Sequence, residues 1–334
     1  MDQNTTQMTE QGVIREARKS YSRSLLNISI FYAVFYIIIT IIIRLMPEKP
    51  TGQTQLLVNY IPFYCIAFPF YLLISKFLPK SVPEKKSLPV IQFILTFFCC
   101  ECISIAGSLI GAMFNVVLSL LLGKNTSSMF LLEGVFGNDS ILFLMIAIVF
   151  APFVEEMVFR KVLIDRIRKY GDGLAIVISG LMFGLFHGNL TQFFYATGIG
   201  MLLAFMYVRT GKAQYNILMH MMMNFWGTFL PRILLRNVDM QAYVSALKKQ
   251  DIATLMELLP SLSPVMILGC VNFTMAAVGL VVMILKRKDF HVNPPEVTLP
   301  KKKRLSAAFL NIGFCSLFAV CIIRFIQQLA EALK

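Results

Sequence analysis

Long apolar runs with few charged interruptions dominate this sequence, and they limit the chain to very few folds. Several runs reach the roughly 20 residues that a helix needs to cross about 30 Å of hydrocarbon. Of the 334 residues, 57% are hydrophobic and 15% are charged, whereas an ordinary soluble domain carries roughly 25% charged residues. In lipid, the backbone N–H and C=O groups of a spanning segment must be hydrogen-bonded within the protein, which only helices and closed barrels achieve. The sequence lacks the short segments of alternating hydrophobicity that are typical of a barrel. The sequence therefore predicts an all-α polytopic transmembrane helical bundle.

The candidate spans are nine apolar runs. They cover residues 25–46, 56–78, 89–122, 141–163, 173–187, 193–208, 214–231, 264–285 and 305–327. The run at 89–122 is longer than one crossing requires, so we expect it to be strongly tilted or bent around Gly107 and Gly111. We therefore expect about nine spans.

The spans and the polar segments between them divide the chain into five regions. We expect a polar cytoplasmic tail at 1–24, N-terminal transmembrane helices at 25–140, a central block at 141–231, an outer loop at 232–263 and C-terminal transmembrane helices at 264–334. No cleavable signal peptide is expected, because the first apolar run is long enough to span the bilayer. All seven cysteines lie inside apolar runs, which indicates buried small side chains rather than a disulfide framework.

Lysine and arginine are concentrated in alternate connections, and this pattern indicates the orientation in the membrane. Positive residues accumulate on the cytoplasmic side of short loops. They precede the first span and follow the second, fourth, sixth and eighth, whereas the segment 188–192 has none. The N-terminus is therefore expected inside and the C-terminus outside. The net charge of +13 reflects topology rather than nucleic-acid binding, because the positive residues are confined to particular loops.

The predicted outer loop at 232–263 fits this pattern less well, because it carries four basic residues. Longer loops follow the rule weakly. Five apolar residues recur in it at helical spacing: Val244, Leu247, Ile252, Leu255 and Leu259. This spacing is compatible with a short amphipathic helix on the outer surface and equally with an ordinary structured loop.

Ionisable residues gather in three of the central runs, although burying one at mid-membrane costs roughly 2.5 to 3.5 kcal/mol. Residues 151–162 read APFVEEMVFRKV, residues 183–189 read FGLFHGN and residues 220–224 read HMMMN. Only three histidines occur in the chain, and two of them, His187 and His220, lie in these runs. Such a concentration predicts a functional site inside the membrane.

Helix geometry assigns part of this site, because residues four apart share a helix face and adjacent residues diverge by about 100°. Glu156 and Arg160 are therefore expected to pair, with the glutamate before the arginine in the favourable order. Glu155 then points elsewhere without a partner in its own helix. His220 and Asn224 are also four apart, so one helix face offers an imidazole and an amide together.

Three short motifs occur in order on these runs. They are EExxxR at Glu155, Glu156 and Arg160, FxxxH at Phe183 and His187, and HxxxN at His220 and Asn224. In this order and membrane context the chain resembles the CPBP family of intramembrane proteases, also called Abi or CAAX-protease-like. That family includes type II CAAX prenyl endopeptidases and bacterial relatives linked to bacteriocin self-immunity and peptide processing. The motifs lie within 141–231, so the resemblance implies a CPBP protease core there.

The resemblance implies a role for each motif residue. Glu155 and His187 would activate a water that attacks a peptide carbonyl, while His220 and Asn224 would stabilise the oxyanion. Glu156 and Arg160 would brace the site. The family is labelled metalloprotease, and Glu155, His187 and His220 could ligate zinc. The HExxH pair of soluble zinc proteases is absent, so direct water activation is favoured over a zinc cofactor.

The resemblance also implies partners and a location. The expected substrate is a membrane-associated protein or peptide, and the expected location is a bacterial cell membrane. His220 would lie about 10 Å from the cytoplasmic start of its span, so the substrate is expected to be reached from the cytoplasmic half of the bilayer. CAAX-type processing and bacterial peptide processing are equal candidates. A non-catalytic scaffold or immunity factor that binds a peptide in the same cavity is the alternative. A proton-coupled transporter is disfavoured, because no paired repeats with broken helices are apparent.

Structural interpretations compete with the functional ones. The two glutamates and the arginine could form a buried salt-bridge cluster that locks helices together, and Asn224 could serve only in helix packing. For Glu101, a role as partner of Arg160 or in helix packing is favoured over a role in catalysis. Arg44 and Arg324 are expected to extend to the membrane interface. The GxxxG spacings at Gly107 and Gly111, and at Gly180 and Gly184, predict close helix approach.

Overall fold

The computed structural model describes residues 9–48, 50–123 and 141–332, except for the side chains of residues 244, 248, 331 and 332. The described residues form helices and no strand, which confirms the all-α prediction. The N-terminal helices are α1 (Glu10–Leu45), α2 (Gly52–Ile61), η1 (Pro62–Ala67), α3 (Phe68–Lys76) and α4 (Val90–Leu122). The central helices are α6 (Ile141–Met145), η2 (Ile146–Phe150), α7 (Ala151–Glu156), η3 (Met157–Ile164), α8 (Asp165–Ile167), η4 (Arg168–Tyr170), α9 (Asp172–Phe186), α10 (Leu190–Thr210), α11 (Ala213–Asn224), η5 (Phe225–Phe229) and α12 (Leu230–Leu235). The C-terminal helices are α13 (Met240–Lys249), α14 (Ile252–Leu285), η6 (Arg287–Asp289), α15 (Lys301–Phe309) and α16 (Ile312–Ala332).

Seven continuous helical segments of the described chain are long and apolar enough to cross a membrane. They are Glu10–Leu45, Gly52–Lys76, Val90–Leu122, Ile141–Tyr170, Leu190–Thr210, Ile252–Leu285 and Ile312–Ala330. The predicted spans at 173–187 and 214–231 correspond to α9 and to the stretch from α11 to α12. Helix α9 has only 15 residues, and α11 carries polar residues that include His220 and Asn224. Both segments are helical, but neither has the length and apolar composition of a typical span.

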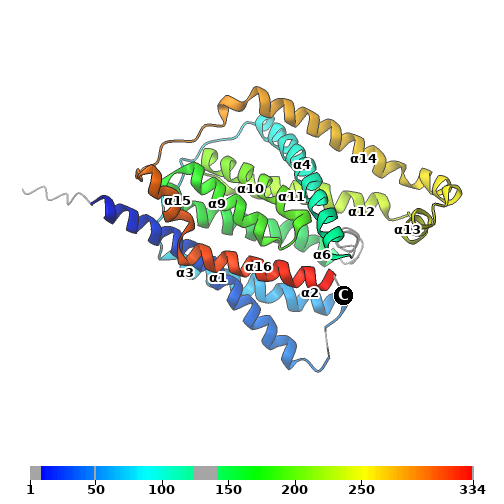
Figure 1. Cartoon of the computed structure of the whole chain (residues 1–334), viewed down its shortest axis with the longest axis horizontal. Helices are drawn as coiled ribbons and strands as arrows, with labels where there is room; N and C mark the ends of the chain where they lie inside the picture. Colours follow the sequence, from blue (N-terminus) through cyan, green and yellow to red (C-terminus); the bar gives the residue numbers. More distant parts are fainter. Residues whose placement is uncertain (1–8, 49, 124–140, 333–334) are drawn as a thin grey trace, which may run out of the picture.

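Helix α4 is one uninterrupted helix of 33 residues, and it crosses the other helices obliquely (Figure 1). The run at 89–122 is therefore a single helix that runs obliquely to its neighbours. Its two glycines lie against α10: a Cβ on Gly107 would be 2.5 Å from the Tyr195 backbone, and one on Gly111 would be 2.8 Å from the Leu190 carbonyl oxygen. The predicted close helix approach is confirmed at this GxxxG spacing.

The second GxxxG spacing places α9 against α10. A Cβ on Gly180 would lie 2.7 Å from the Met201 backbone nitrogen, and a Cβ on Gly184 would lie 2.8 Å from the Phe193 carbonyl oxygen. Helix α10 thus lies between α4 and α9, with glycines of both neighbours at its surface. This close packing fixes the position of α9, whose last turn carries Phe183 and His187.

Three π-helical stretches in the described chain are each followed by a proline. Pro69 follows η1, Pro152 follows η2 and Pro231 follows η5, each two residues after the stretch ends. Proline lacks the backbone N–H that would bond to a carbonyl one turn earlier, so it leaves a carbonyl free. Single π-helical turns of this kind are frequent at functional sites.

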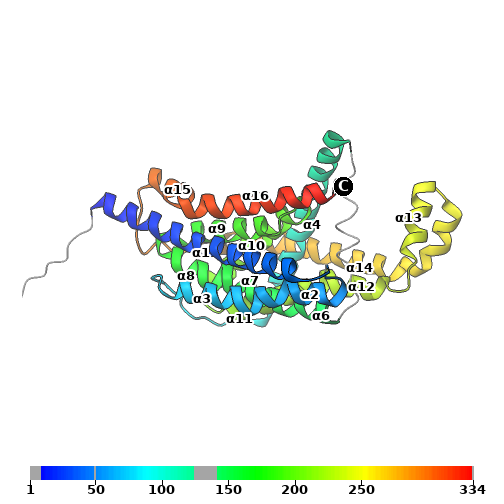
Figure 2. The same cartoon turned by 90° about the horizontal axis from the view of Figure 1, so that it is seen from below.

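Most basic connections meet at one end of the bundle, which we call the basic end. The segments there are joined by main-chain bonds: Ser81 N donates to Asp165 O, Lys86 N to Thr210 O and Val297 N to Lys169 O. Figures 1 and 2 place the start of α1 and α15 at this end, and α12, α13 and the end of α16 at the opposite end. The two ends of the described chain therefore lie on opposite sides of the bundle.

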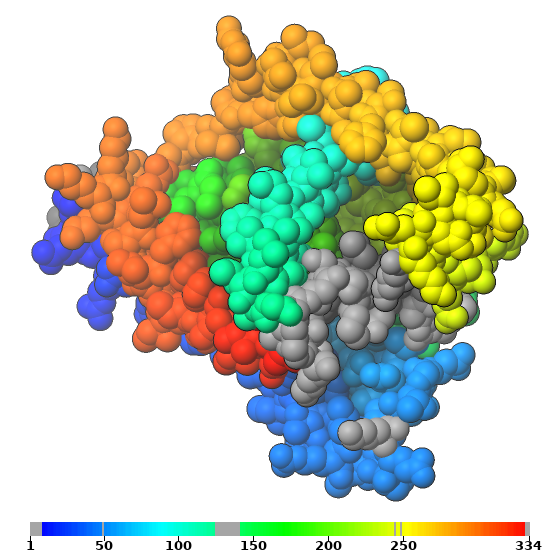
Figure 3. Space-filling model, turned by 45° about the vertical axis from the view of Figure 1, so that its right-hand side comes forward, coloured from blue at the N-terminus to red at the C-terminus, as the bar shows by residue number. Residues whose placement is uncertain are grey.

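The region predicted as an outer loop contains α12, α13 and the first turns of α14. Helix α13 ends at Lys249, and the next residue, Gln250, has a positive φ of 54°. Asp251 then caps α14 by accepting from Thr254 N. The apolar residues with helical spacing are thus divided between two helices instead of forming one. Figure 3 shows α13 and the start of α14 standing out from the rest of the molecule.

Candidate active site

Glu156 is the centre of the predicted cluster. Its Oε1 atom lies 3.0 Å from Nη1 of Arg160 and 2.8 Å from Nδ1 of His220. Glu156 and Arg160 are fully buried, and His220 is 7% exposed. The pairing of Glu156 with Arg160, predicted from their spacing, is confirmed. The bond to His220 joins helices 64 residues apart in sequence, and helix periodicity could not reveal it.

Phe183 fills the space between the charged residues and the histidines. The guanidinium carbon of Arg160 lies 4.3 Å from the centre of its ring, within the range of a cation–π interaction. The same ring meets the imidazoles of His187 and His220 edge to face, with centroids 4.9 Å and 5.6 Å away. Arg160 also donates to the Gly200 carbonyl oxygen at 3.3 Å. The Phe183 ring therefore packs against three polar side chains: Arg160, His187 and His220.

Glu155 faces the other nitrogen of the same imidazole. Its Oε2 atom is 3.8 Å from His220 Nε2, and its side chain is 18% exposed. This distance exceeds a hydrogen bond, so the carboxylate can accept from another molecule. As predicted, Glu155 has no partner within its own helix. Of the two adjacent glutamates, Glu156 is held by other residues and Glu155 is available.

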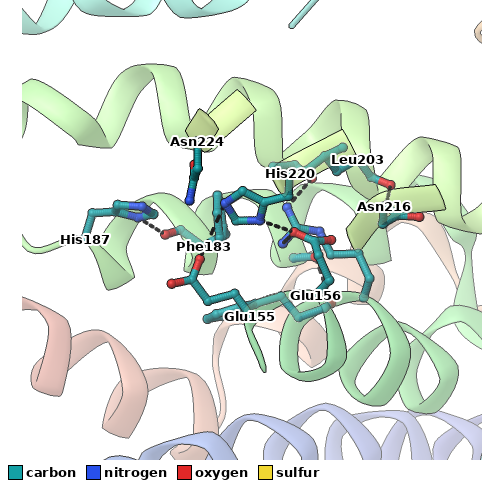
Figure 4. Close-up of polar contacts among 12 residues, drawn as sticks. Glu155, Glu156, Phe183, His187, Leu203, Asn216, His220 and Asn224 are labelled. Carbon is teal, nitrogen blue, oxygen red and sulfur yellow. Dashed lines mark hydrogen bonds and ion pairs between the residues drawn. The ribbon is translucent and has the colours of Figure 1, made fainter. Parts of the chain in front are cut away.

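His187 ends α9, where its Nδ1 lies 2.9 Å from the Phe183 carbonyl oxygen. With the proton on Nδ1, this atom donates to the carbonyl and Nε2 is left as an acceptor. No direct contact joins His187 to Glu155 in the described part of the chain. Figure 4 shows the side chains of Glu155, His187, His220 and Asn224 turned toward a common space. The geometry thus suits a pair that acts through a water molecule.

Asn224 donates from Nδ2 to the Ala147 carbonyl oxygen at 2.8 Å. Ala147 lies in the π-helical stretch η2, where each carbonyl bonds to the N–H five residues later, as Ile146 does with Ala151. The partner of Ala147 would be Pro152, which has no N–H. The Asn224 amide satisfies this free carbonyl and is thereby fixed beside the site.

The prediction for Arg324 is corrected, and of the two alternatives for Glu101 the described contacts leave the packing role. Arg324 does not extend to the interface: its Nη1 donates to the Tyr32 hydroxyl at 3.0 Å and to the Phe186 carbonyl oxygen at 2.9 Å. Glu101 is buried at 5% exposure on α4, but the described contacts of Arg160 do not include it. Neither arrangement follows from hydropathy, because both depend on how helices distant in sequence are placed.

The proposed zinc ligands can be compared with this geometry. Within residues 9–48, 50–123 and 141–332, no three His, Cys, Asp or Glu side chains come close enough together to hold a metal ion. His220 Nδ1 is engaged by Glu156, and His187 Nδ1 is engaged by a backbone carbonyl. As placed, Glu155, His187 and His220 do not fit a three-ligand zinc site.

Fold and site together define a polytopic α-helical membrane protein with a carboxylate–imidazole site between its helices. Residues 137–226 match the family model Rce1-like, described as "Type II CAAX prenyl endopeptidase Rce1-like". This match covers the segment that carries the three motifs, and it supports the resemblance to the CPBP family.

A curated relative matches part of the chain. The protein named "Putative membrane peptidase YdiL" of Bacillus subtilis (strain 168) is 32% identical over 84 residues, which is 25% of this chain and 34% of that protein. The match thus spans about a third of the relative's length. No solved structure matches the chain.

Proposed function

We propose that this protein is an intramembrane endopeptidase that hydrolyses a peptide bond in a membrane-associated protein or peptide. The observation that carries the proposal is the placement of His220 between two carboxylates, with Glu156 held by Arg160 and Glu155 available. A buried charge cluster that served only to lock helices together would leave no carboxylate free. The match of residues 137–226 to a family model of prenyl endopeptidases supports the same interpretation.

In the proposed reaction, Glu155 and the Nε2 of His187 hold a water molecule between them. Glu155 takes a proton from this water as its oxygen attacks the peptide carbonyl carbon. The same carboxylic acid then gives the proton to the amide nitrogen as the carbon–nitrogen bond breaks. The products are a carboxylic acid and an amine, so atoms and protons balance without a metal ion.

The negative charge that develops on the carbonyl oxygen requires donors. In its protonated form, His220 donates from Nδ1 to Glu156 and presents Nε2–H to the substrate oxygen. Asn224 contributes its amide, which its bond to Ala147 holds beside the site. Donors fixed before the reaction cost no reorganisation, and removal of one such donor typically lowers kcat about 100- to 1000-fold.

The substrate class follows from the family description and from the placement of the site inside the helical bundle. CAAX-type processing and processing of a bacterial peptide, including bacteriocin immunity, are the two forms of the activity that we propose. Both require a substrate that enters from within the membrane, in the cytoplasmic half of the bilayer. The bilayer of a bacterial cell is the proposed location.

The test is cleavage of candidate membrane peptides by the purified protein in proteoliposomes, read by mass spectrometry. Glu155→Gln and His187→Ala are expected to abolish cleavage, whereas Glu101→Gln, a buried carboxylate in another helix, is expected to retain it. A zinc chelator is expected to leave the rate unchanged. Equal cleavage by the wild type, Glu155→Gln and His187→Ala would overturn the mechanism. Loss of cleavage with chelator, restored by zinc, would show that a metal ion takes part.

A biological assay separates the endopeptidase from a protein that only binds a peptide in the same cavity. If the cellular phenotype depends on hydrolysis, Glu155→Gln removes it although the protein still inserts and folds. A phenotype that persists in Glu155→Gln would instead establish the scaffold.

A further inference from the structure

Arg324 is a guanidinium in the middle of an apolar helix with no carboxylate partner among the described residues. It lies twelve residues after the start of α16 and eight before its end. Its contacts are the Tyr32 hydroxyl and the Phe186 carbonyl, together with the faces of both rings at 5.5 Å and 5.6 Å. All of these direct partners are neutral. The Glu155 carboxylate lies within electrostatic range of the guanidinium but forms no ion pair with it in the described part of the chain.

Only one nitrogen of this guanidinium is used. Both hydrogen bonds come from Nη1, which supplies two of the five N–H donors of an arginine. The donors on Nε and Nη2 have no acceptor in the part of the chain that the structure describes. A neutral side chain could donate the two existing hydrogen bonds. These bonds alone therefore do not explain why a charged guanidinium is placed here.

Gln328 lies one turn further along α16, next to Arg324. Its Oε1 atom is buried and has no hydrogen-bond partner among the described residues. Both side chains flank Gly188: a Cβ on that glycine would be 3.4 Å from Gln328 Oε1 and 3.5 Å from Arg324 Cβ. Gly188 directly follows His187, so Arg324 and Gln328 lie beside the candidate active site.

We propose that Arg324 and Gln328 form a substrate subsite that binds a carboxylate of the peptide close to the bond that is cleaved. This inference rests on the proposed endopeptidase function. The free N–H groups of Arg324 match a carboxylate in a two-point interaction, and Gln328 Oε1 accepts a backbone N–H of the same peptide. The carboxylate is either the C-terminal group of the substrate or an aspartate or glutamate side chain.

A phospholipid phosphate fits this location less well than a peptide does. Arg324 lies well inside its span and contacts Phe186, the residue before His187. A headgroup lies at the membrane surface, and a long side chain reaches it only from near a helix end. A peptide bound for cleavage passes His187 and therefore also passes Arg324.

Matched peptides test this subsite in proteoliposomes of neutral lipid. One pair differs only in a C-terminal carboxylate or carboxamide, and the other only in aspartate or asparagine near the cleaved bond. The wild type is expected to favour the acidic member of one pair at least about tenfold in kcat/KM, mainly through KM, because hydrogen bonds to charged groups are strong. Arg324→Gln is expected to cleave both members equally, and Arg324→Lys to retain part of the preference. Arg44→Gln, an exposed arginine in α1, is the control and should behave like the wild type.

The outcomes separate this subsite from the proposed function. A purely structural Arg324 would lower cleavage of both members of a pair alike, which would overturn the subsite. A wild type without a preference, in a protein whose Glu155→Gln variant is inactive, would overturn the subsite and leave the endopeptidase intact. Stimulation by anionic lipid that Arg324→Gln abolishes would assign the arginine to a headgroup instead.

Discussion

Glu156 and Arg160 compensate each other's charge in a place that water does not reach. Replacing Glu156 by Gln leaves a fully buried guanidinium without its counter-ion, and removal of one partner of a buried pair typically costs about 3 to 5 kcal/mol. We expect Glu156→Gln to lower the unfolding midpoint markedly in detergent, as measured by circular dichroism against denaturant. Glu155→Gln is the control and is expected to stay near the wild type. An unchanged midpoint for Glu156→Gln would show that the pair does not stabilise the fold.

Asn224 and Asn216 both lie on α11 and allow a matched comparison. Asn216 is fully buried and donates to the Leu203 carbonyl oxygen at 2.6 Å, whereas Asn224 is partly exposed and faces the site. We expect Asn224→Ala to lower kcat about 100-fold or more with little change in stability. Asn216→Ala is expected to lower stability and to leave kcat of the folded fraction unchanged. Both variants are compared by kinetics and by unfolding. A lower stability for Asn224→Ala together with a lower kcat for Asn216→Ala would contradict this assignment.

Local spacing predicted part of this site and could not predict the rest. The pairing of Glu156 with Arg160 depends on one helical turn, so it was readable from sequence. The bond from Glu156 to His220, and the contact of Arg324 with Phe186, join helices far apart in the chain. The partner of Asn224 depends on the π-helical register before Pro152, which no periodicity in the sequence reveals.

At the scale of helices, glycines control how closely neighbours approach. Gly180 lies against the backbone of α10, where a Cβ would be 2.7 Å from Met201 N, whereas a Cβ on Gly269 of α14 would meet nothing within 4 Å. We expect Gly180→Leu to destabilise the protein by at least about 1 to 3 kcal/mol, because the backbone itself must move. The same substitution at Gly269 is expected to have little effect. Thermal unfolding in detergent measures both, and equal midpoints would contradict close packing at α9.

Hydropathy predicted the long helices well because membrane-spanning segments must be apolar over their full length. It was less informative at α9 and α11, which carry the site. Helix α9 is short, and α11 contains the polar residues that the proposed chemistry needs. Site-bearing helices thus depart from the pattern that makes other spans recognisable. The division of residues 232–263 into separate helices likewise depends on Gln250 and Asp251, not on apolar spacing.

At the scale of the whole molecule, the basic end gives an orientation that can be tested. Positive loops stay on the cytoplasmic side, so Glu84 at this end is expected inside and Asp251, between α13 and α14, outside. Glu84→Cys and Asp251→Cys can be labelled with a membrane-impermeant maleimide. The native cysteines all lie within helices, so the wild type provides the background. We expect labelling of Asp251→Cys in intact cells and of Glu84→Cys only after permeabilisation.

The same experiment locates the site relative to the membrane surfaces. His220 is seven residues after the start of α11 at the basic end, which corresponds to about 10 Å along the helix. If the basic end is cytoplasmic, His220 and its partner Glu156 lie in the inner half of the bilayer, and substrates must enter from that side. Labelling of Glu84→Cys in intact cells, with Asp251→Cys protected, would show that the orientation is the opposite of the one expected. Substrate entry would then be expected from the outer half, and peptides added outside intact cells would be cleaved.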